Sequence, residues 1–296
     1  MRSGILLWIL WLLIAGVGCA QAFQLAYKDT PGTVRWYRTQ VVFYGSFTTQ
    51  PMNKITHLNG TVGFTLVEKV LAVGTDGLAS IQAKISDGSL FVNLPDLDQP
   101  PITVPIPALT VNYKRSPAGK ISEIAIEGLP ASITGMPGMN LLNELKMFSQ
   151  AGTGLEFPTG MIQAGDSWTN DTSIEIMGQK LAIQRLNTLR GPRVVHQASY
   201  LQIDSTVTMK APALTFQLPT GGKTVTIHEA LDTSVKATTL FDATAGEMFS
   251  TWLDGDSHFT ITGPRRGTDE TVTTTGTIHI SGGMSKIAPP RAMTAR

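Results

Sequence analysis

The chain of 296 residues contains one cysteine, Cys19, and charged residues make up only 15% of it. A single thiol cannot form a disulfide within the chain, so the fold must be stabilised by burial of apolar side chains. Lysine and arginine total 23 and aspartate and glutamate total 22, a balance that favours neither nucleic acid nor an anionic surface. We therefore expect neither a disulfide scaffold nor a nucleic-acid partner.

The sequence also lacks the motifs of common enzymes and metal sites. It has no Gly-x-Ser-x-Gly segment and no glycine pattern of a nucleotide-binding loop. The five histidines are scattered, with no pair at the spacing of zinc ligands. We therefore predict no catalytic residue, no metal site and no cofactor. The alternative is an envelope hydrolase whose titratable residues converge only in three dimensions.

The first 22 residues have the layout of a secretory signal. Arg2 precedes fourteen apolar or small residues, Ile5 to Gly18, and further small residues follow. As a helix, this run would be about 21 Å long, shorter than the roughly 30 Å hydrocarbon core of a bilayer. We therefore predict an exported protein, periplasmic or extracellular, with residues 1–22 as its signal peptide.

Two processing routes compete within four residues. The segment Ala20-Gln21-Ala22 fits signal peptidase, which would leave Phe23 at the new N-terminus. The segment Val17-Gly18-Cys19 resembles the end of a lipoprotein signal, with Cys19 as the lipidated residue, although Gly16 stands where that signal usually has leucine. An uncleaved leader is the third route. We expect the first, and contact with a membrane only through Cys19 or an uncleaved leader.

After the leader, apolar and polar residues alternate with a period of two. The clearest examples are Ala79 to Ser86 and Leu201 to Met209. Such alternation predicts strands with one buried and one solvated face. Turns are predicted where glycine follows a turn former or precedes proline, at Asp76-Gly77, Asp87-Gly88, Gly191-Pro192, Ala245-Gly246 and Asp254-Gly255. The predicted class is mainly β, built from curved antiparallel sheets.

One amphipathic helix is predicted near 138–151, with Leu141, Leu145 and Phe148 on its apolar face. It would end a β-rich half over 23–152, followed by a second over 153–283 and a disordered basic tail over 284–296. Segments 60–85 and 178–203 share a strand, turn, strand pattern, which would relate the two halves. Whether the halves form one sheet or two domains stays open.

Three short segments carry a resemblance. They are Leu155-Glu156-Phe157-Pro158, then Ala164-Gly165-Asp166-Ser167-Trp168, and later Phe241 to Gly246. In these segments the chain resembles an uncharacterised group of exported bacterial proteins with a GDSW or GDTW element. The resemblance implies a curved antiparallel sheet with few helices, and it transfers no catalytic residue. A looser likeness is to lipoprotein-carrier folds, in which a half-open sheet wraps an apolar ligand.

The residues of the GDSW element allow a catalytic and a structural interpretation. Ser167 lies beside the carboxylate of Asp166, but adjacency does not orient a base, so we interpret the segment as a turn that enters a strand. The sequence as a whole favours a non-enzymatic binding or envelope-associated protein. An apolar small molecule or lipid would lie between sheet and helix, against Leu141, Leu145 and Phe148. A purely structural surface protein is the third alternative.

Overall fold

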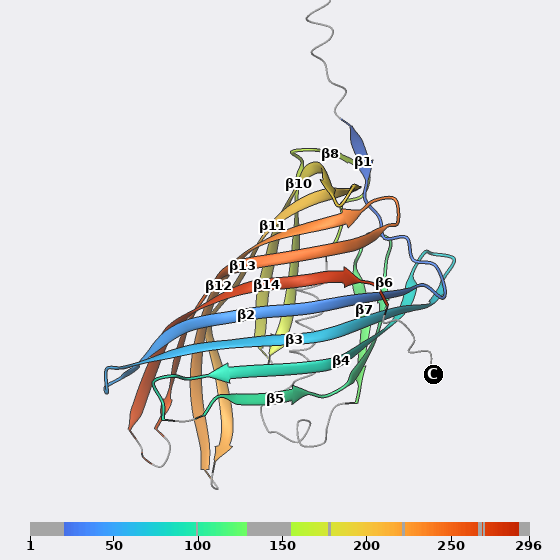
Figure 1. Ribbon diagram of the computed structural model, residues 1–296. Helices are drawn as coiled ribbons and strands as arrows, with labels where there is room; N and C mark the ends of the chain where they lie inside the picture. Colours follow the sequence, from blue (N-terminus) through green and yellow to red (C-terminus); the bar gives the residue numbers. More distant parts are fainter. Residues whose placement is uncertain are drawn as a thin grey trace, which may run out of the picture.

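The computed structural model describes residues 21–98, 100–128, 155–176, 179–220, 223–265, 268 and 270–289. Within these ranges the chain forms antiparallel strands and no helix (Figure 1), so the predicted mainly β, antiparallel class is confirmed. The helix predicted near 138–151 lies outside the described residues, as do Cys19, Leu141, Leu145 and Phe148. The strands are β1 (Ala22–Gln24), β2 (Val34–Gln50), β3 (Lys54–Val73), β4 (Ala79–Asn93), β5 (Ile102–Ile106), β6 (Leu109–Arg115), β7 (Ile121–Glu127), β8 (Met161–Gln163), β9 (Ser167–Ile176), β10 (Gln179–Val195), β11 (Ala198–Thr220), β12 (Lys223–Asp242), β13 (Glu247–Pro264) and β14 (Thr271–Ile287).

Twelve of these strands belong to one sheet, in the order β7-β6-β4-β3-β2-β14-β13-β12-β11-β10-β9, with β5 paired to β4. Strands β1 and β8 form a separate small sheet. The two β-rich halves meet where β2 pairs with β14, from Trp36 opposite Ile287 to Gln50 opposite Thr273. Both halves therefore contribute to one continuous sheet.

The predicted turns divide into two groups. Asp76-Gly77 and Ala245-Gly246 do join strands, β3 to β4 and β12 to β13. The other three predictions were wrong, because Asp87-Gly88, Gly191-Pro192 and Asp254-Gly255 lie inside β4, β10 and β13. The first two coincide with register shifts in their ladders, where an extra residue bulges out of the strand. Turn-forming residues therefore mark bulges as well as strand ends here.

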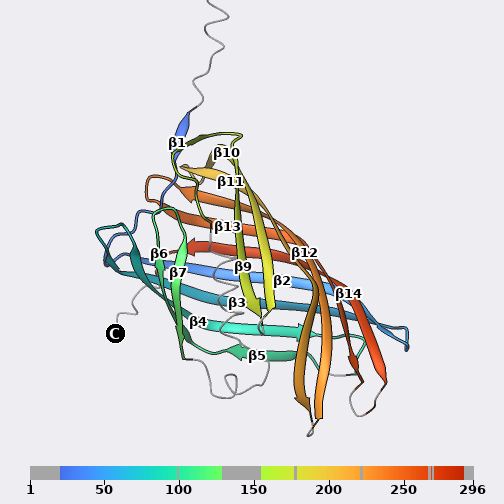
Figure 2. The same ribbon diagram turned by 180° about the vertical axis from the view of Figure 1, so that it is seen from behind.

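The sheet is rolled, with β6, β7, β9 and β10 lying across from the central strands (Figures 1 and 2). We call the face that carries Tyr37, Leu66 and Ile81 the inner face and the opposite one the outer face. Glycines allow neighbouring strands to crowd together on the inner face. A Cβ at Gly255 would lie 2.2 Å from the Ser234 carbonyl oxygen, a separation that no other residue tolerates. Because glycine has no side chain, such positions permit the strong curvature of the sheet.

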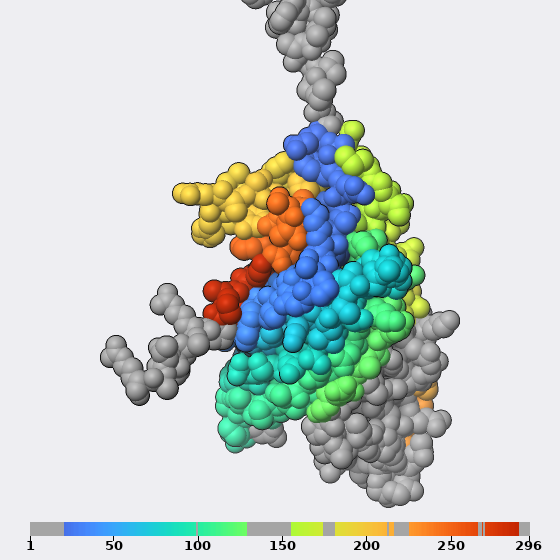
Figure 3. Space-filling model, turned by 90° about the vertical axis from the view of Figure 1, so that its right-hand side faces the viewer, coloured from blue at the N-terminus to red at the C-terminus, as the bar shows by residue number. Residues whose placement is uncertain are grey.

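One end of the rolled sheet is closed by two segments, one before β2 and one that follows the N-terminal half. The side chains of Leu25, Tyr27, Leu155 and Phe157 pack on inner-face residues of β10, β11 and β12. Figure 3 shows the N-terminal segment (blue) against the yellow-green segment that follows residue 155. We call this closure, residues 25–33 and 155–166, the covered end. At its centre Phe241 is fully buried, with its ring 4.8 Å from that of Phe157.

The GDSW element joins this closure to the sheet. Gly165 has a φ of +97°, and the Asp166 carboxylate accepts a hydrogen bond from the Gln163 N–H at 2.8 Å. Strand β9 then begins at Ser167, and the Trp168 indole N–H donates to the Glu156 carbonyl at 2.7 Å. The interpretation as a turn that enters a strand is confirmed.

Candidate functional site

A buried ion network lies beneath the covered end. The N-terminal arm, residues 25–33, places the Asp29 carboxylate between two guanidinium groups, those of Arg35 on β2 and Arg115 on β6. Asp29 Oδ1 accepts hydrogen bonds from Arg35 Nη1 at 2.7 Å and from Arg115 Nη2 at 2.8 Å. All three side chains are almost completely removed from solvent. One carboxylate of the arm thus joins strands from both sides of β3 and β4.

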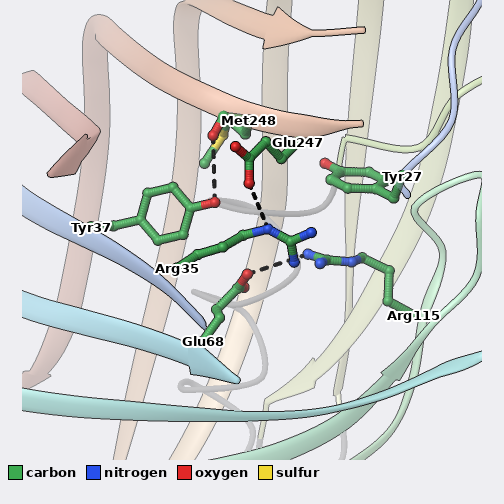
Figure 4. A pocket seen from close by; sticks show the side chains of 7 residues that line it. All are labelled: Tyr27, Arg35, Tyr37, Glu68, Arg115, Glu247 and Met248. Carbon is green, nitrogen blue, oxygen red and sulfur yellow. Dashed lines mark hydrogen bonds and ion pairs between the residues drawn. The ribbon is translucent and has the colours of Figure 1, made fainter. Parts of the chain in front are cut away.

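Two glutamates complete the network (Figure 4). Glu247, at the start of β13, accepts from Arg35 Nε at 2.8 Å and also pairs with Lys286 of β14. Glu68 of β3 lies 3.6 Å from Arg115 Nη1 and accepts a 2.5 Å hydrogen bond from the Tyr113 hydroxyl. These contacts connect β2, β3, β6, β13 and β14 with the arm.

Aromatic rings enclose the charges. The Arg115 guanidinium carbon lies 4.4 Å from the centroid of the Tyr27 ring, a cation–π contact. Burial raises the pKa of Tyr27 to about 12 and also raises the pKa values of Tyr37 and Tyr113 above their usual range. These phenols are therefore neutral at physiological pH, and the hydroxyls of Tyr37 and Tyr113 donate to the Met248 carbonyl and to Glu68.

The network resembles an active site only in bringing titratable groups together. Among the residues that the structure describes, its contacts join three carboxylates to three cations, so its formal charge is zero. The cavity beside it has a volume of about 10 Å³, the scale of one water molecule. Its lining residues, Tyr27, Arg35, Tyr37, Glu68, Arg115, Glu247 and Met248, include no serine, cysteine or histidine. The arrangement therefore favours a structural role, in which the network holds the arm against the sheet, over a catalytic one.

The network should make stability depend on pH. Burial alone would raise the pKa of Asp29, but hydrogen bonds and charges from Arg115 and Arg35 outweigh it, and the pKa lies below its ordinary 3.8. Because the folded-state pKa is depressed, this stabilisation is present above pH 3.8 and is lost as the pH falls through the folded-state value. We expect the free energy of unfolding, measured in urea, to fall less steeply with acid in Asp29→Asn than in wild type. The control Asp204→Asn, at a more exposed pair, should keep more of the wild-type slope, and equal slopes for Asp29→Asn and wild type would contradict the assignment.

Sequence reasoning missed this network, although a signal was present. In β6 the inner-face positions read Leu109, Val111, Tyr113 and Arg115, and in β3 they include Leu66, Glu68 and Val70. A charge in register with apolar residues points into the core. Which carboxylate meets which guanidinium depends on the strand order, which the alternation does not contain.

Beyond the network, the inner face carries many apolar side chains that are only partly buried, together with buried polar side chains such as Thr56, Thr251 and Ser257. Its half-buried apolar members are Val41, Phe43 and Phe47 of β2, Leu58, Val62 and Phe64 of β3, Leu90 and Val92 of β4, Leu253 and Phe259 of β13, and Ile278 and Ile280 of β14. Farther from the covered end, Ile102 and Val104 of β5 and Ile261 of β13 are exposed on the same face. Apolar side chains therefore reach solvent on the inner face.

The outer face is mixed, and exposed apolar side chains such as Val42, Tyr44 and Trp252 lie on it beside many polar ones. Along β12, β13 and β14 it carries Asp232, Ser234 and Lys236, then Asp254, Asp256 and His258, then Thr275, Thr277 and His279. His279 lies between two carboxylates. The hydrogen bond from its Nδ1 to Asp256 Oδ1 at 3.0 Å, together with the charge of Asp254, raises the pKa of His279. No group of histidine, cysteine, aspartate or glutamate within the described ranges has a metal-binding arrangement.

The residues predicted to line a ligand, Leu141, Leu145 and Phe148, and the predicted lipidation site Cys19 lie outside the described ranges, so those predictions stand as they were. The part of the chain that the structure describes contains no helix long and apolar enough to cross a membrane. Comparison with known proteins leaves the resemblance of the GDSW element as an expectation: no family model and no curated protein matches the chain.

Proposed function

We propose that the chain is an exported, non-enzymatic binding protein that holds an elongated apolar molecule, such as the hydrocarbon portion of a lipid, along the inner face of the rolled sheet. The observation that carries the proposal is the partial exposure of apolar side chains on that face. Val104 is 46% exposed although its side chain shares the inner face with Leu90 and Val62.

Exposed apolar surface of this extent favours a ligand on energetic grounds. Burial of apolar surface contributes about 25 cal/mol per Å². A dozen half-buried apolar side chains from five strands border one another on the inner face, whereas isolated apolar residues are normal on any surface. A contiguous apolar surface is the usual mark of a site that takes an apolar partner.

The shape of the face suits a long ligand. Strand β2 has 17 residues, about 55 Å at the usual rise of roughly 3.3 Å per residue. Its inner positions are polar near the covered end, at Arg35, and apolar from Val41 to Phe47. A hydrocarbon chain would therefore lie toward the uncovered end, away from the ion network.

A matched pair of valines tests this proposal. Val104 is on the inner face and Val42, which is 42% exposed, is on the outer face. The probe is a neutral long-chain alcohol with a pyrene group at the end of its chain, added to delipidated exported protein. We expect Val104→Glu to weaken binding about tenfold, because the contact with the probe loses one aliphatic side chain and gains a charge. Val42→Glu should bind as wild type does.

Two outcomes would reject the proposal. One is a wild-type protein that does not bind the pyrene alcohol. The other is equal weakening by Val42→Glu and Val104→Glu, which would place the binding surface elsewhere. Because both valines are substantially exposed, neither substitution should unfold the protein, and circular dichroism checks this directly.

A further inference from the structure

His279 occupies the junction between the two halves of the sheet. It lies in β14, which pairs with β13 on one side and, on the other, with β2 of the N-terminal half (Figure 1). Asp256 of β13 and Tyr44 of β2 are its directly opposite partners in the two ladders. All three side chains are on the outer face. One imidazole ring can therefore contact both halves of the sheet at once.

Two carboxylates approach the two ring nitrogens of His279. Its Nδ1 lies 3.0 Å from Asp256 Oδ1, and its Nε2 lies 3.3 Å from Asp254 Oδ2. An ionised carboxylate only accepts hydrogen bonds, whereas a neutral imidazole carries a single N–H. The neutral ring can therefore donate to one aspartate, and the other aspartate then faces a nitrogen lone pair. Only the imidazolium form satisfies both contacts.

The third neighbour of the ring also favours a positive charge. The Tyr44 ring centroid is 4.8 Å from that of His279, within the range of cation–π contacts. The His279 side chain is only 23% exposed, so water screens its contacts less than those of a fully exposed ring. The protonated ring thus links β13, through the two aspartates, to β2, through Tyr44.

Two further titratable side chains lie on the neighbouring strands. On β13, His258 is opposite Thr277, and its Nδ1 is 2.8 Å from the Thr277 hydroxyl. On β12, Lys236 is opposite Asp254, on the side of β13 that faces away from β14. On β2, the outer-face residues beside Tyr44 are uncharged. The charge that faces the imidazole is therefore that of the two aspartates.

We propose that His279 is a proton-dependent clasp, which in its protonated form ties β13 and β2 to β14 on the outer face and loosens this junction when the proton leaves. The inference is independent of the proposed ligand, because it uses none of the inner-face residues.

The clasp gives the pH dependence a definite sign. The hydrogen bond to Asp256 and the charge of Asp254 raise the pKa of His279 above its ordinary 6.5. Because the folded-state pKa is raised, this stabilisation is complete below pH 6.5 and is lost as the pH rises through the folded-state value. The sign is opposite to that of Asp29, whose contribution is lost in acid.

Nuclear magnetic resonance of the exported protein, with isotopically labelled histidine, tests the clasp directly. We expect both ring nitrogens of His279 to be mostly protonated at pH 6.5, and the titration midpoint to lie above 6.5. Asp256→Asn should lower the midpoint, because the amide keeps the shape of the side chain but not its charge. The matched control Asp232→Asn removes a carboxylate of the same 55% exposure that pairs with Lys210, and should leave the midpoint unchanged.

Urea unfolding measures the consequence for the junction. Between about pH 6 and about pH 8, the unfolding equilibrium constant of the wild type should rise as His279 loses its proton. This rise should be smaller in His279→Gln, which keeps a polar side chain without a titratable charge. His258→Gln should keep the wild-type rise, since His258 contacts a hydroxyl group.

Three results would overturn the proposal. They are a His279 midpoint at or below 6.5, equal shifts of the midpoint in Asp256→Asn and Asp232→Asn, and a pH dependence of unfolding in His279→Gln that equals that of the wild type. If His279→Gln does not fold, the unfolding of Asp256→Asn is compared with that of Asp232→Asn over the same pH range, and the rise should be smaller in Asp256→Asn.

Discussion

Replacing Arg115 by methionine should lower the free energy of unfolding by about 3–5 kcal/mol, the usual result of removing one partner of a buried ion pair. The substitution preserves most of the apolar volume of the side chain but leaves Asp29 and Glu68 with one cationic partner fewer. An unpaired carboxylate costs far more free energy when it is buried than when it is exposed to water. The loss is measured by urea denaturation at neutral pH.

The control is the same substitution at the surface. Arg190 forms a 2.8 Å pair with Asp204, but its side chain is exposed, so Arg190→Met should change stability by less than about 1 kcal/mol. A double-mutant cycle of Arg115→Met with Asp29→Asn should show strong coupling, because the two changes disrupt the same hydrogen bonds. If Arg115→Met is no more damaging than Arg190→Met, the network does not fasten the fold.

The second large effect is expected at the centre of the covered end. Phe241→Ala should destabilise the protein by about 3–5 kcal/mol, because it removes a fully buried ring and leaves a cavity. The ring makes edge-on contacts with both Tyr27 and Phe157, so its loss also loosens the arm and the segment before β8. Thermal and urea unfolding both report the change.

The control uses a phenylalanine on the outer face. Phe91 of β4 is exposed, so Phe91→Ala should cost much less than Phe241→Ala. Limited proteolysis adds a second readout, since a loosened arm should be cut near residues 25–33 in the Phe241→Ala variant before the sheet is attacked. Equal losses in the two variants would show that the covered end adds nothing to stability.

The sequence predicted which side chains of a strand are buried, but it did not predict the order in which the strands pair. Alternation at Ala79 to Ser86 matches a strand whose inner positions Ala79, Ile81 and Ala83 are buried, because side-chain direction is a local property of a strand. The pairing of β2 with β14 is a contact between distant segments, and no local pattern specifies it. The turn at Asp254-Gly255 was mispredicted for the same reason, since the neighbouring Ser234 backbone explains that glycine.

The candidate sites show the same division. An apolar ligand surface was predicted between the sheet and a helix, but the residues named for it, Leu141, Leu145 and Phe148, lie outside the described ranges. The ion network could not be predicted, because Asp29 sits in an arm without periodicity and reaches Arg115 across 86 positions of sequence. Only the order of strands brings those charges together.

The pairing of β2 with β14 also determines how the chain acquires its fold. Gly45 and Ile278, which are partners in this ladder, are 233 positions apart (278 minus 45), so the central seam has a very high contact order. Such contacts form slowly, because a long loop must close before they contribute. Until residues 271–287 arrive, β2 and β13 each present an unpaired edge. Strand β14 therefore joins the two halves of the sheet, and a chain truncated before Thr271 would have two separate half-sheets, each with an unpaired edge strand.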